Sequence, residues 1–260
     1  MGERYLKLIQ KVALAGVVSG CLLSCGGRVS STTGAGADIT PDDSAPSAPA
    51  ILPLGASRVE GYRPQFESYR YELWKDLVEA GLTFDFIGTR ADQAAYPTFL
   101  EQEFDRDNEG WGGYTSGNLL EGLPGWLEAA GTPDIVLFSS PGGNDLLMNM
   151  PFDDAVANVT GMIDVLQEAN PEVTILIEQF APGRSDSEIW SADMEDRWRE
   201  MNATVVELAE TKSTDMSQVV VVDMATGFQD DFLADDVHYN EEGAAFVAER
   251  YFEALSELLE

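Results

Sequence analysis

Short apolar runs alternate with longer amphipathic segments from residue 51 to the end of the chain. Two of the runs, Ile-Val-Leu-Phe at 135–138 and four valines at 219–222, contain no polar position. Continuous apolar runs are typical of strands that are buried on both faces of a parallel sheet. Five such strands are predicted, over residues 51–54, 84–88, 134–139, 173–180 and 219–224.

The segments between these runs have the apolar spacing of helices that pack one face against a sheet. Helices are predicted over residues 66–80, 119–130, 153–169, 189–210 and 241–259. Regular alternation of strand and helix predicts an α/β protein, a three-layer α/β/α sandwich with a five-stranded parallel sheet. Ligands bind such sheets at the carboxyl ends of the strands, so polar motifs that directly follow a strand are candidate site residues.

The N-terminus has a different pattern. Lys7 and Lys11 precede an apolar stretch at 12–18, which Leu-Leu at 22–23 extends. A positive flank and a short apolar core predict a secretory signal peptide over residues 1–25, too short for a membrane span. The only two cysteines, Cys21 and Cys25, end this stretch, and each is preceded by residues that resemble the lipobox of bacterial lipoproteins.

The acylated cysteine is a choice between these two. The residues before Cys21 fit the lipobox more closely, whereas Cys25 gives a longer apolar core and leaves no stray thiol, so we favour Cys25. An ordinary signal peptide with incidental cysteines is the alternative. The expected location is the bacterial cell envelope, either periplasmic or at the cell surface, with a lipid anchor holding the protein at the membrane.

Residues 26–50 consist almost entirely of Ser, Thr, Gly, Ala, Asp and Pro, a composition that predicts a flexible linker. Residues 51–260 are long enough for one domain with a full core. No cysteine lies beyond residue 25, so this domain has no internal disulfide and depends on its core for stability.

The formal net charge is −31, from 46 acidic and 15 basic residues. This charge repels phosphate backbones and argues against a nucleic-acid partner. The acids are dispersed, which indicates a solvated surface rather than an acidic tail. One histidine and no cysteine in the domain leave no metal site in the pattern, and the glycine-rich stretches lack the Lys-Ser/Thr of a phosphate loop, so no cofactor is expected.

The single histidine, His238, follows Asp235, Asp236 and Val237 near the C-terminus. Histidine is the side chain that titrates near neutral pH without perturbation, so His238 is the candidate general base. A carboxylate three residues earlier can accept from the second ring nitrogen and fix the tautomer. Asp236 adjoins and is the alternative partner.

Two polar motifs upstream follow predicted strands. Ser57 comes after Gly55 and Ala56, small residues that allow a sharp turn in which the hydroxyl and its own N–H can both face a bound acyl group. Asn144 lies in Ser-Pro-Gly-Gly-Asn-Asp at 140–145, where its side-chain amide can donate to a developing oxyanion.

Taken in order, these motifs resemble the conserved blocks of the SGNH (GDSL-like) hydrolases. The Tyr-Arg at 69–70, the Leu-Trp at 73–74 and the Phe-Asp-Phe-Ile-Gly at 84–88 are similar to the carbohydrate-esterase, or acetyl-esterase, branches. The resemblance implies the flavodoxin-like SGNH fold, with Ser57 as nucleophile, His238 as base and Asp235 as its orienting partner. It also implies an oxyanion hole formed by the Ser57 N–H, the Gly113 N–H and the Asn144 amide, with Gly112 as the rival of Gly113.

Two departures from the family pattern are present. Ala56 stands where the family has Asp, which predicts a looser turn and a lower rate, and the block around Gly113 lacks the histidines that relatives often carry. The resemblance implies a serine esterase for short-chain esters, with acetyl groups on carbohydrate as the expected substrate. Trp111 and Trp190 are candidates for stacking on sugar rings, with a core position as the alternative for each.

Two other functions remain open. The site could hydrolyse lysophospholipids or longer acyl esters. Alternatively, the loss of the family Asp at Ala56 could mark a catalytically weakened module that binds glycans.

Overall fold

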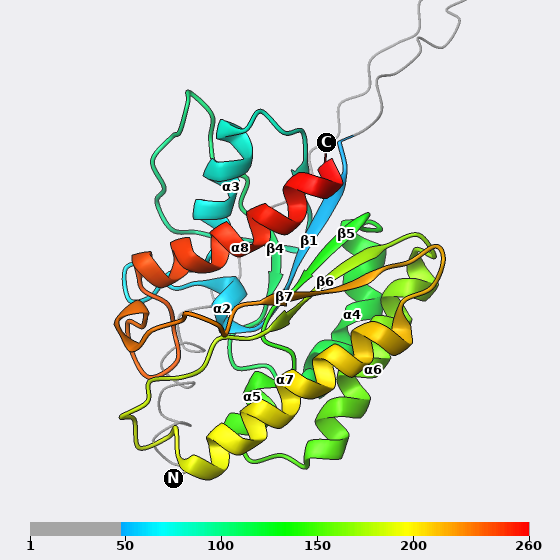
Figure 1. The fold of residues 1–260 in the computed structure, drawn as a ribbon. Helices are drawn as coiled ribbons and strands as arrows, with labels where there is room; N and C mark the ends of the chain where they lie inside the picture. The colour runs from blue at the N-terminus through cyan, green and yellow to red at the C-terminus, as the bar shows by residue number, and fades with distance from the viewer. Residues whose placement is uncertain (1–47, 260) are drawn as a thin grey trace, which may run out of the picture.

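A central sheet covered by helices on both faces forms the frame of residues 48–259, which are the residues that the computed structural model describes (Figure 1). The predicted signal peptide with Cys21 and Cys25, and nearly all of the predicted linker, lie outside the described residues. The domain begins with β1 at Ala50, one residue before the predicted boundary.

The sheet has seven strands in the order β3-β4-β1-β5-β6-β7, with β2 pairing the start of β1. All pairs are parallel except β3 with β4. The strands are β1 (Ala50–Gly55), β2 (Asp85–Phe86), β3 (Arg90–Ala91), β4 (Asp107–Gly110), β5 (Ile135–Phe138), β6 (Thr174–Gln179) and β7 (Val219–Asp223).

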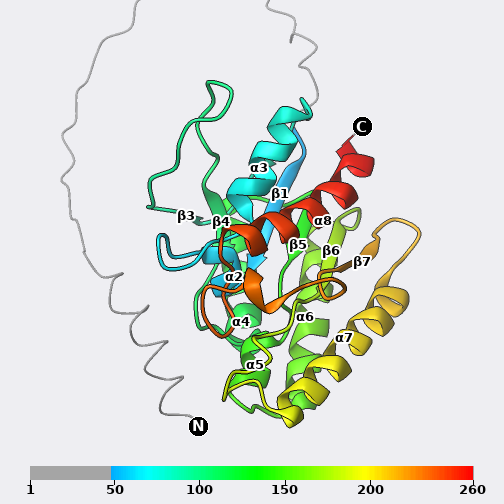
Figure 2. The same cartoon turned by 60° about the vertical axis from the view of Figure 1, so that its left-hand side comes forward.

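Two separate cores cover the two faces of the sheet. α3 (Arg70–Glu79) and α8 (Glu241–Leu259) pack on one face, whereas α4 (Ser116–Ala130), α6 (Phe152–Ala169) and α7 (Ala192–Lys212) pack on the other. Figure 2 shows the same three layers from a second direction.

The four residues of β5 alternate between these cores. Ile135 and Leu137 contact the α3–α8 side, and Val136 and Phe138 contact the α4–α6–α7 side. A strand that is covered on both faces has no solvent-facing position, which explains the continuous apolar run. The predicted three-layer α/β fold is confirmed.

The predicted count of five strands is wrong, because β3 and β4 were not expected. β4 reads Asp-Asn-Glu-Gly, yet Asn108 and Glu109 are buried. The Glu109 carboxylate accepts hydrogen bonds from the Thr89 backbone N–H at 2.8 Å and from the Trp111 indole N–H at 2.6 Å. These partners compensate for the cost of burying a charge, a possibility that hydrophobic spacing does not reveal.

The predicted helix over 66–80 begins four residues late, at Arg70. Phe66 instead forms a bridge with Tyr62, and the Glu67 N–H donates to the Tyr239 carbonyl at 2.8 Å, so this segment runs alongside the chain near His238. Two short helices were also not predicted. They are α2 (Ser57–Glu60) and α5 (Gly143–Leu147), which directly follow β1 and β5.

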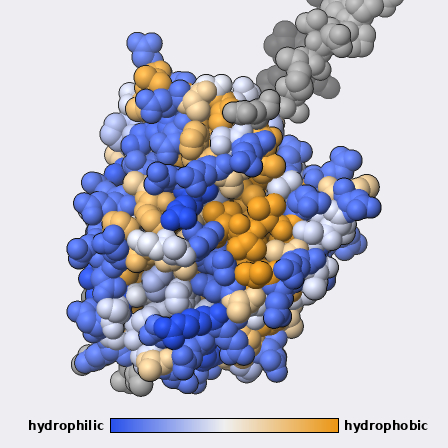
Figure 3. Space-filling model, viewed as in Figure 1, coloured by the Kyte–Doolittle hydropathy of each residue, from blue (hydrophilic) through white to orange (hydrophobic). Residues whose placement is uncertain are grey.

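Hydrophilic side chains cover most of the face seen in Figure 3, interrupted by a hydrophobic area. This distribution agrees with the dispersed acidic residues of the sequence. Within residues 48–259, no helix combines the length and the apolarity that crossing a bilayer requires.

Candidate active site

Ser57 begins α2, at the sharp turn that follows β1. The Glu60 N–H donates to the Ala56 carbonyl and the Gly61 N–H to the Ser57 carbonyl, both at 2.9 Å. A methyl group at Gly55 would lie 2.9 Å from the Ser139 carbonyl oxygen, so glycine is needed where β1 and β5 end close together. The turn is therefore closed by backbone bonds, with Ala56 in place of the family Asp.

His238 lies directly opposite Ser57 although 181 residues separate them. Its Nε2 is 2.9 Å from the Ser57 Oγ, and its Nδ1 is 2.7 Å from an Asp235 carboxylate oxygen. With the proton on Nδ1, the ring donates to Asp235 and accepts from the Ser57 hydroxyl. The three side chains form one continuous chain of hydrogen bonds.

Asp235 also fixes the backbone of the loop that carries His238. Its second carboxylate oxygen accepts from the Val237 N–H at 2.9 Å and from the His238 N–H at 2.8 Å. Burial raises the pKa of the Asp235 carboxyl, but the His238 side chain and these two N–H groups outweigh it and lower the pKa from 3.8 to about 2. Asp235, not the adjacent Asp236, is the carboxylate that the structure pairs with His238.

Phe66 covers the imidazole on one side. Its ring stacks on that of His238 with a centroid separation of 3.9 Å and an interplanar angle of 14°, and His238 is only 6% exposed. The stacked ring limits rotation of the imidazole and keeps water from that face. Sequence reasoning missed this residue, because its helical spacing with later residues gave no sign that it turns toward a loop near the C-terminus.

The candidate glycines follow β4. The Gly112 N–H donates to a carboxylate oxygen of Glu60 at 2.9 Å, so this N–H is already bonded to a side chain of α2. Gly113 has a φ of +82°, a left-handed conformation that favours glycine, and no group in the described part of the chain accepts from its N–H. Of the two rivals, Gly113 is therefore the one whose N–H makes no hydrogen bond within the described residues.

Asn144 lies in α5, one turn after β5. Its side-chain amide donates to the Tyr114 carbonyl at 2.8 Å, which ties it to the loop that contains Gly113. The next residue, Asp145, accepts from the Ser116 N–H at 2.7 Å and from the Ser116 hydroxyl at 2.8 Å. α5 is therefore held against the start of α4.

The turn before Asn144 depends on a carboxylate that sequence reasoning missed. Ser140 has a left-handed φ of +49°, and its N–H donates to the fully buried Glu178 at 2.8 Å. The other oxygen of Glu178 accepts from the Tyr251 hydroxyl at 2.8 Å. Burial raises the pKa of Glu178, with these hydrogen bonds acting in the opposite direction.

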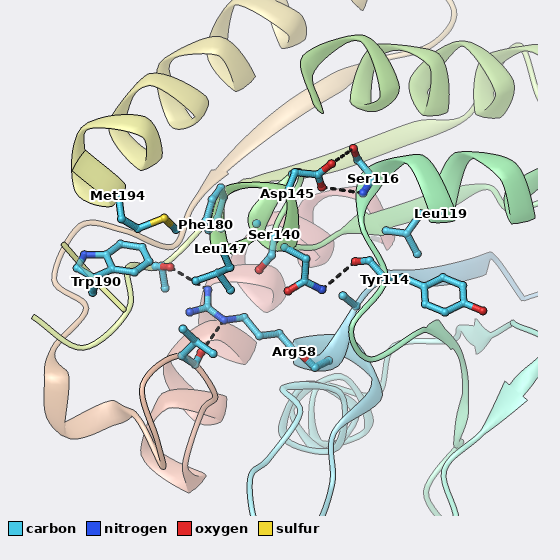
Figure 4. Close-up of a pocket in the computed structure, with 17 residues that line it drawn as sticks. Arg58, Tyr114, Ser116, Leu119, Ser140, Asp145, Leu147, Phe180, Trp190 and Met194 are labelled. Atoms are coloured by element: carbon cyan, nitrogen blue, oxygen red, sulfur yellow. Dashed lines mark hydrogen bonds between the residues drawn. The ribbon is translucent and has the colours of Figure 1, made fainter. Parts of the chain in front are cut away.

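A pocket opens beside Ser57, and Figure 4 shows the side chains that line it. Ser57, Asn144 and Trp190 are among the lining residues, whereas Gly113 and Trp111 are not. Trp111 stacks with both Trp126 and Tyr114, at centroid separations of 5.0 and 5.2 Å. Most of the remaining wall is apolar, formed by Leu119, Leu147, Phe180, Ala181, Met194 and Val237.

No group of three or more His, Cys, Asp or Glu side chains within residues 48–259 is arranged to hold a metal ion.

Residues 54–246 match the GDSL-like Lipase/Acylhydrolase family. The chain belongs to this family. It is accordingly a carboxylic ester hydrolase with the SGNH fold. No curated protein matches the chain.

Solved structures include similar proteins of known class. A carbohydrate esterase family 3 protein from Talaromyces cellulolyticus is 27% identical with a TM-score of 0.69, over 81% of this chain and 98% of that one. An acetyl esterase mutant with acetate ion has the same identity, TM-score and coverage. A family 3 carbohydrate esterase from Clostridium thermocellum is 26% identical with a TM-score of 0.65, over 82% of this chain and all of that one.

The Asp235–His238 pair predicts a stability component that is lost in acid. The folded pKa of Asp235 lies below its ordinary value of 3.8, so the ionised group stabilises the fold above about pH 4, and the contribution disappears as pH falls toward 2. Because the side chain is 34% exposed, solvent screening keeps this component to about 1–2 kcal/mol.

Denaturant unfolding of the wild type and Asp235→Asn measures it. We expect the difference in unfolding free energy to shrink by about 1–2 kcal/mol between about pH 6 and about pH 2. Asp236→Asn is the matched control, since its side chain is not bonded to His238, and should show no such change. An Asp235→Asn difference that stays constant over this range would contradict the assignment.

Proposed function

We propose that the protein is a serine esterase in which Ser57 attacks the ester carbonyl and His238 acts as general base. The observation that carries the proposal is the hydrogen-bond chain from the Ser57 Oγ through His238 to Asp235, at 2.9 and 2.7 Å. His238 Nε2 takes the hydroxyl proton as the Oγ–carbon bond forms, then gives it to the departing alcohol. Asp235 keeps the proton on Nδ1 and stabilises the imidazolium.

The second half of the reaction uses the same groups. Water attacks the acyl group on Ser57, its proton passes to His238 Nε2, and the Ser57 oxygen recovers that proton as the acid leaves. Phe66 and Asp235 together restrain the imidazole through both halves. A base that serves twice must return to one position, which this packing favours.

The proposed oxyanion hole consists of the Ser57 N–H, the Gly113 N–H and the Asn144 side-chain amide. The engagement of Gly112 with Glu60 supports Gly113 as the glycine donor. The bond from Asn144 to Tyr114 supports a fixed orientation of the amide. Donors held in advance toward the developing charge are worth about 3–4 kcal/mol each in comparable sites.

Acetyl esters of carbohydrate are the proposed substrate class. Support comes from the 26–27% identity to carbohydrate esterase family 3 proteins and to an acetyl esterase that binds acetate in its crystal. Trp190 lines the pocket and is the better placed of the two candidate tryptophans for contact with the substrate. Trp111 packs on two other aromatic rings and does not line this pocket.

Replacing the nucleophile or the base should abolish turnover. Ser57→Ala and His238→Ala are expected to lower kcat on nitrophenyl acetate by about 10⁴-fold or more, since each removes a member of a unit that acts together. Ser256→Ala, at a partly exposed position on α8 where the hydroxyl donates only to the Glu253 carbonyl, is the control and should keep wild-type activity. A fluorophosphonate should label the wild type and not Ser57→Ala. Full hydrolysis by either variant would refute the mechanism.

Longer acyl esters are the second candidate substrate, favoured by the apolar wall of the pocket. Nitrophenyl esters from acetyl to palmitoyl, followed by acetylated xylan, separate the two classes. We expect kcat/KM to be highest for acetyl and to fall as the chain lengthens. An optimum above about eight carbons would instead assign the site to lipid esters.

We also propose export and lipid anchoring through Cys25, with Cys21 as the alternative. Support comes only from the sequence, namely the basic flank, the short apolar core and the two lipobox-like segments. In a bacterial host, a clickable palmitate analogue should label the full chain, and Cys25→Ala should lose the label while Cys21→Ala keeps it. The reverse result would assign the anchor to Cys21. An unlabelled wild-type chain would reject lipid anchoring.

A further inference from the structure

Arg58 joins the residue after the nucleophile to the residue before the base. It follows Ser57 in α2. Its Nε donates at 2.9 Å to the carbonyl of Val237, the residue directly before His238. The same guanidinium donates to the Ala181 carbonyl at 2.8 Å and to the Pro182 carbonyl at 3.2 Å. Figure 4 shows Arg58 extending along the pocket, with dashed lines from its guanidinium to carbonyl oxygens.

These bonds are unusual for so acidic a chain. Acidic residues outnumber basic ones by 46 to 15, yet Arg58 forms no ion pair within the described part of the chain. Its guanidinium is buried, with 8% of the residue exposed, and lies 4.7 Å from the centre of the Tyr239 ring. A buried charge that binds three neutral carbonyls is costly unless its geometry serves a purpose.

A guanidinium is suited to fixing a distance between segments. Its N–H groups point outward from one rigid plane, so bonds to several acceptors determine the relative positions of those acceptors. Here the acceptors belong to the loop after β6 and to the loop that carries His238. A lysine ammonium can satisfy one or two of them but lacks the planar fork.

A second arginine holds the opposite side of the same loop. Arg184 donates to the Leu233 carbonyl at 2.7 Å and to the Asp235 carbonyl at 3.2 Å, and its backbone N–H donates to Asp236 at 2.8 Å. Within the described residues, neither the side chain nor the backbone N–H of Arg184 forms a hydrogen bond with α2. In this part of the chain, Arg58 therefore makes the side-chain tie between α2 and the loop of the base that is separate from the Ser57–His238 hydrogen bond itself.

We propose that Arg58 is a positioning residue that sets the separation between the Ser57 Oγ and the His238 Nε2. The inference rests on the proposed roles of Ser57 and His238. It goes beyond them in assigning a specific function to a side chain that lines the pocket but makes no hydrogen bond to the Ser57 hydroxyl or to the His238 imidazole. When Arg58 is shortened, the Ser57–His238 hydrogen bond is left without a second link between α2 and the loop of His238, while Asp235 and Arg184 still hold the loop's own shape.

The kinetic test compares Arg58→Lys and Arg58→Met with Arg70→Lys. Arg70 is the control because it too is a buried arginine that donates to carbonyls, those of Val59 at 2.7 Å, Glu60 at 3.0 Å and Arg106 at 3.2 Å. It also pairs with Asp92, and it makes no bond to the His238 loop. We expect Arg58→Met to lower kcat by about 100-fold and Arg58→Lys by about 10-fold, with KM for nitrophenyl acetate unchanged within about twofold, since small misplacements of reacting groups act on kcat.

Arg70→Lys should lower the Tm about as much as Arg58→Lys does, but it should leave kcat within about threefold of the wild type. Circular dichroism confirms that each variant is folded at the assay temperature. If Arg58→Met does not fold, Arg58→Gln takes its place, because its amide can still donate to one carbonyl. Equal losses of kcat in Arg58→Lys and Arg70→Lys would overturn the proposal, since they would mark a general effect on stability.

The single histidine allows a second readout that does not depend on activity. Protein labelled with ¹⁵N-histidine contains one imidazole, so its two nitrogen signals need no assignment to a residue. Ser57→Ala supplies the reference for an Nε2 without its serine hydrogen bond. We expect the Nε2 signal of Arg58→Lys to move toward that reference while the Nδ1 signal, which reports the bond to Asp235, stays in place.

An Nε2 signal of Arg58→Lys identical to that of the wild type would overturn the proposal. The failure of the proposed function is separate, because it is seen as retained hydrolysis in Ser57→Ala or His238→Ala. In that event the nitrogen signals would still report whether Arg58 holds the two side chains together.

Discussion

The hydrogen bond between the Ser57 hydroxyl and the His238 imidazole is the contact on which the site depends. Its two partners come from the first and last parts of the domain, and no local structure can bring them together. The parallel sheet does so, because β1 and β7 end at the same edge and the loops after them meet there. The order β4-β1-β5-β6-β7 also places the loops with Gly113 and Asn144 next to Ser57.

Buried polar groups around this contact are satisfied by backbone more than by opposite charges. Glu178 holds the Ser140 N–H, Asp145 holds the start of α4, and Arg58 binds three carbonyls. Each side chain thus constrains the path of a loop rather than neutralising a neighbour. Loops fixed in this way keep their groups preorganised, which is how electrostatic catalysis avoids reorganisation during the reaction.

The strands that the sequence predicted correctly are those that contain an apolar run, even where a buried polar residue such as Glu178 of β6 follows it. β5 and β7 were identified because no polar residue interrupts the four apolar residues of β5 or the four valines that begin β7. β4 was missed because Glu109 and Asn108 are buried with partners that lie elsewhere in the chain. The predicted start of α3 at residue 66 was too early because of another distant contact. Phe66 has the spacing of a helical residue, but its ring stacks on His238 and lies outside the helix.

Motif order was sufficient to choose Ser57, Asp235, His238 and Asn144 as candidates. In the structure Ser57 and Asn144 line one pocket, and Asp235 and His238 reach it through the hydrogen bond to Ser57. The motifs did not indicate which residues hold these groups in place. Phe66, Arg58 and Glu178 act through contacts 38 to 179 residues away in sequence or through ring stacking, and their residue types alone carry no signal of this. Residues that bind substrate fall at strand ends, whereas supporting residues can come from any segment that the fold brings near.

The direction of β1 determines how the pocket is presented. β1 starts at Ala50, where the chain enters the domain, and ends at Gly55, two residues before Ser57 (Figure 1). A strand of six residues spans about 20 Å, so the catalytic hydroxyl and the point of entry lie at opposite ends of the sheet. The chain therefore enters the described domain at the end of the sheet that lies opposite the pocket beside Ser57, so nothing attached at that entry point needs to pass the mouth of the pocket.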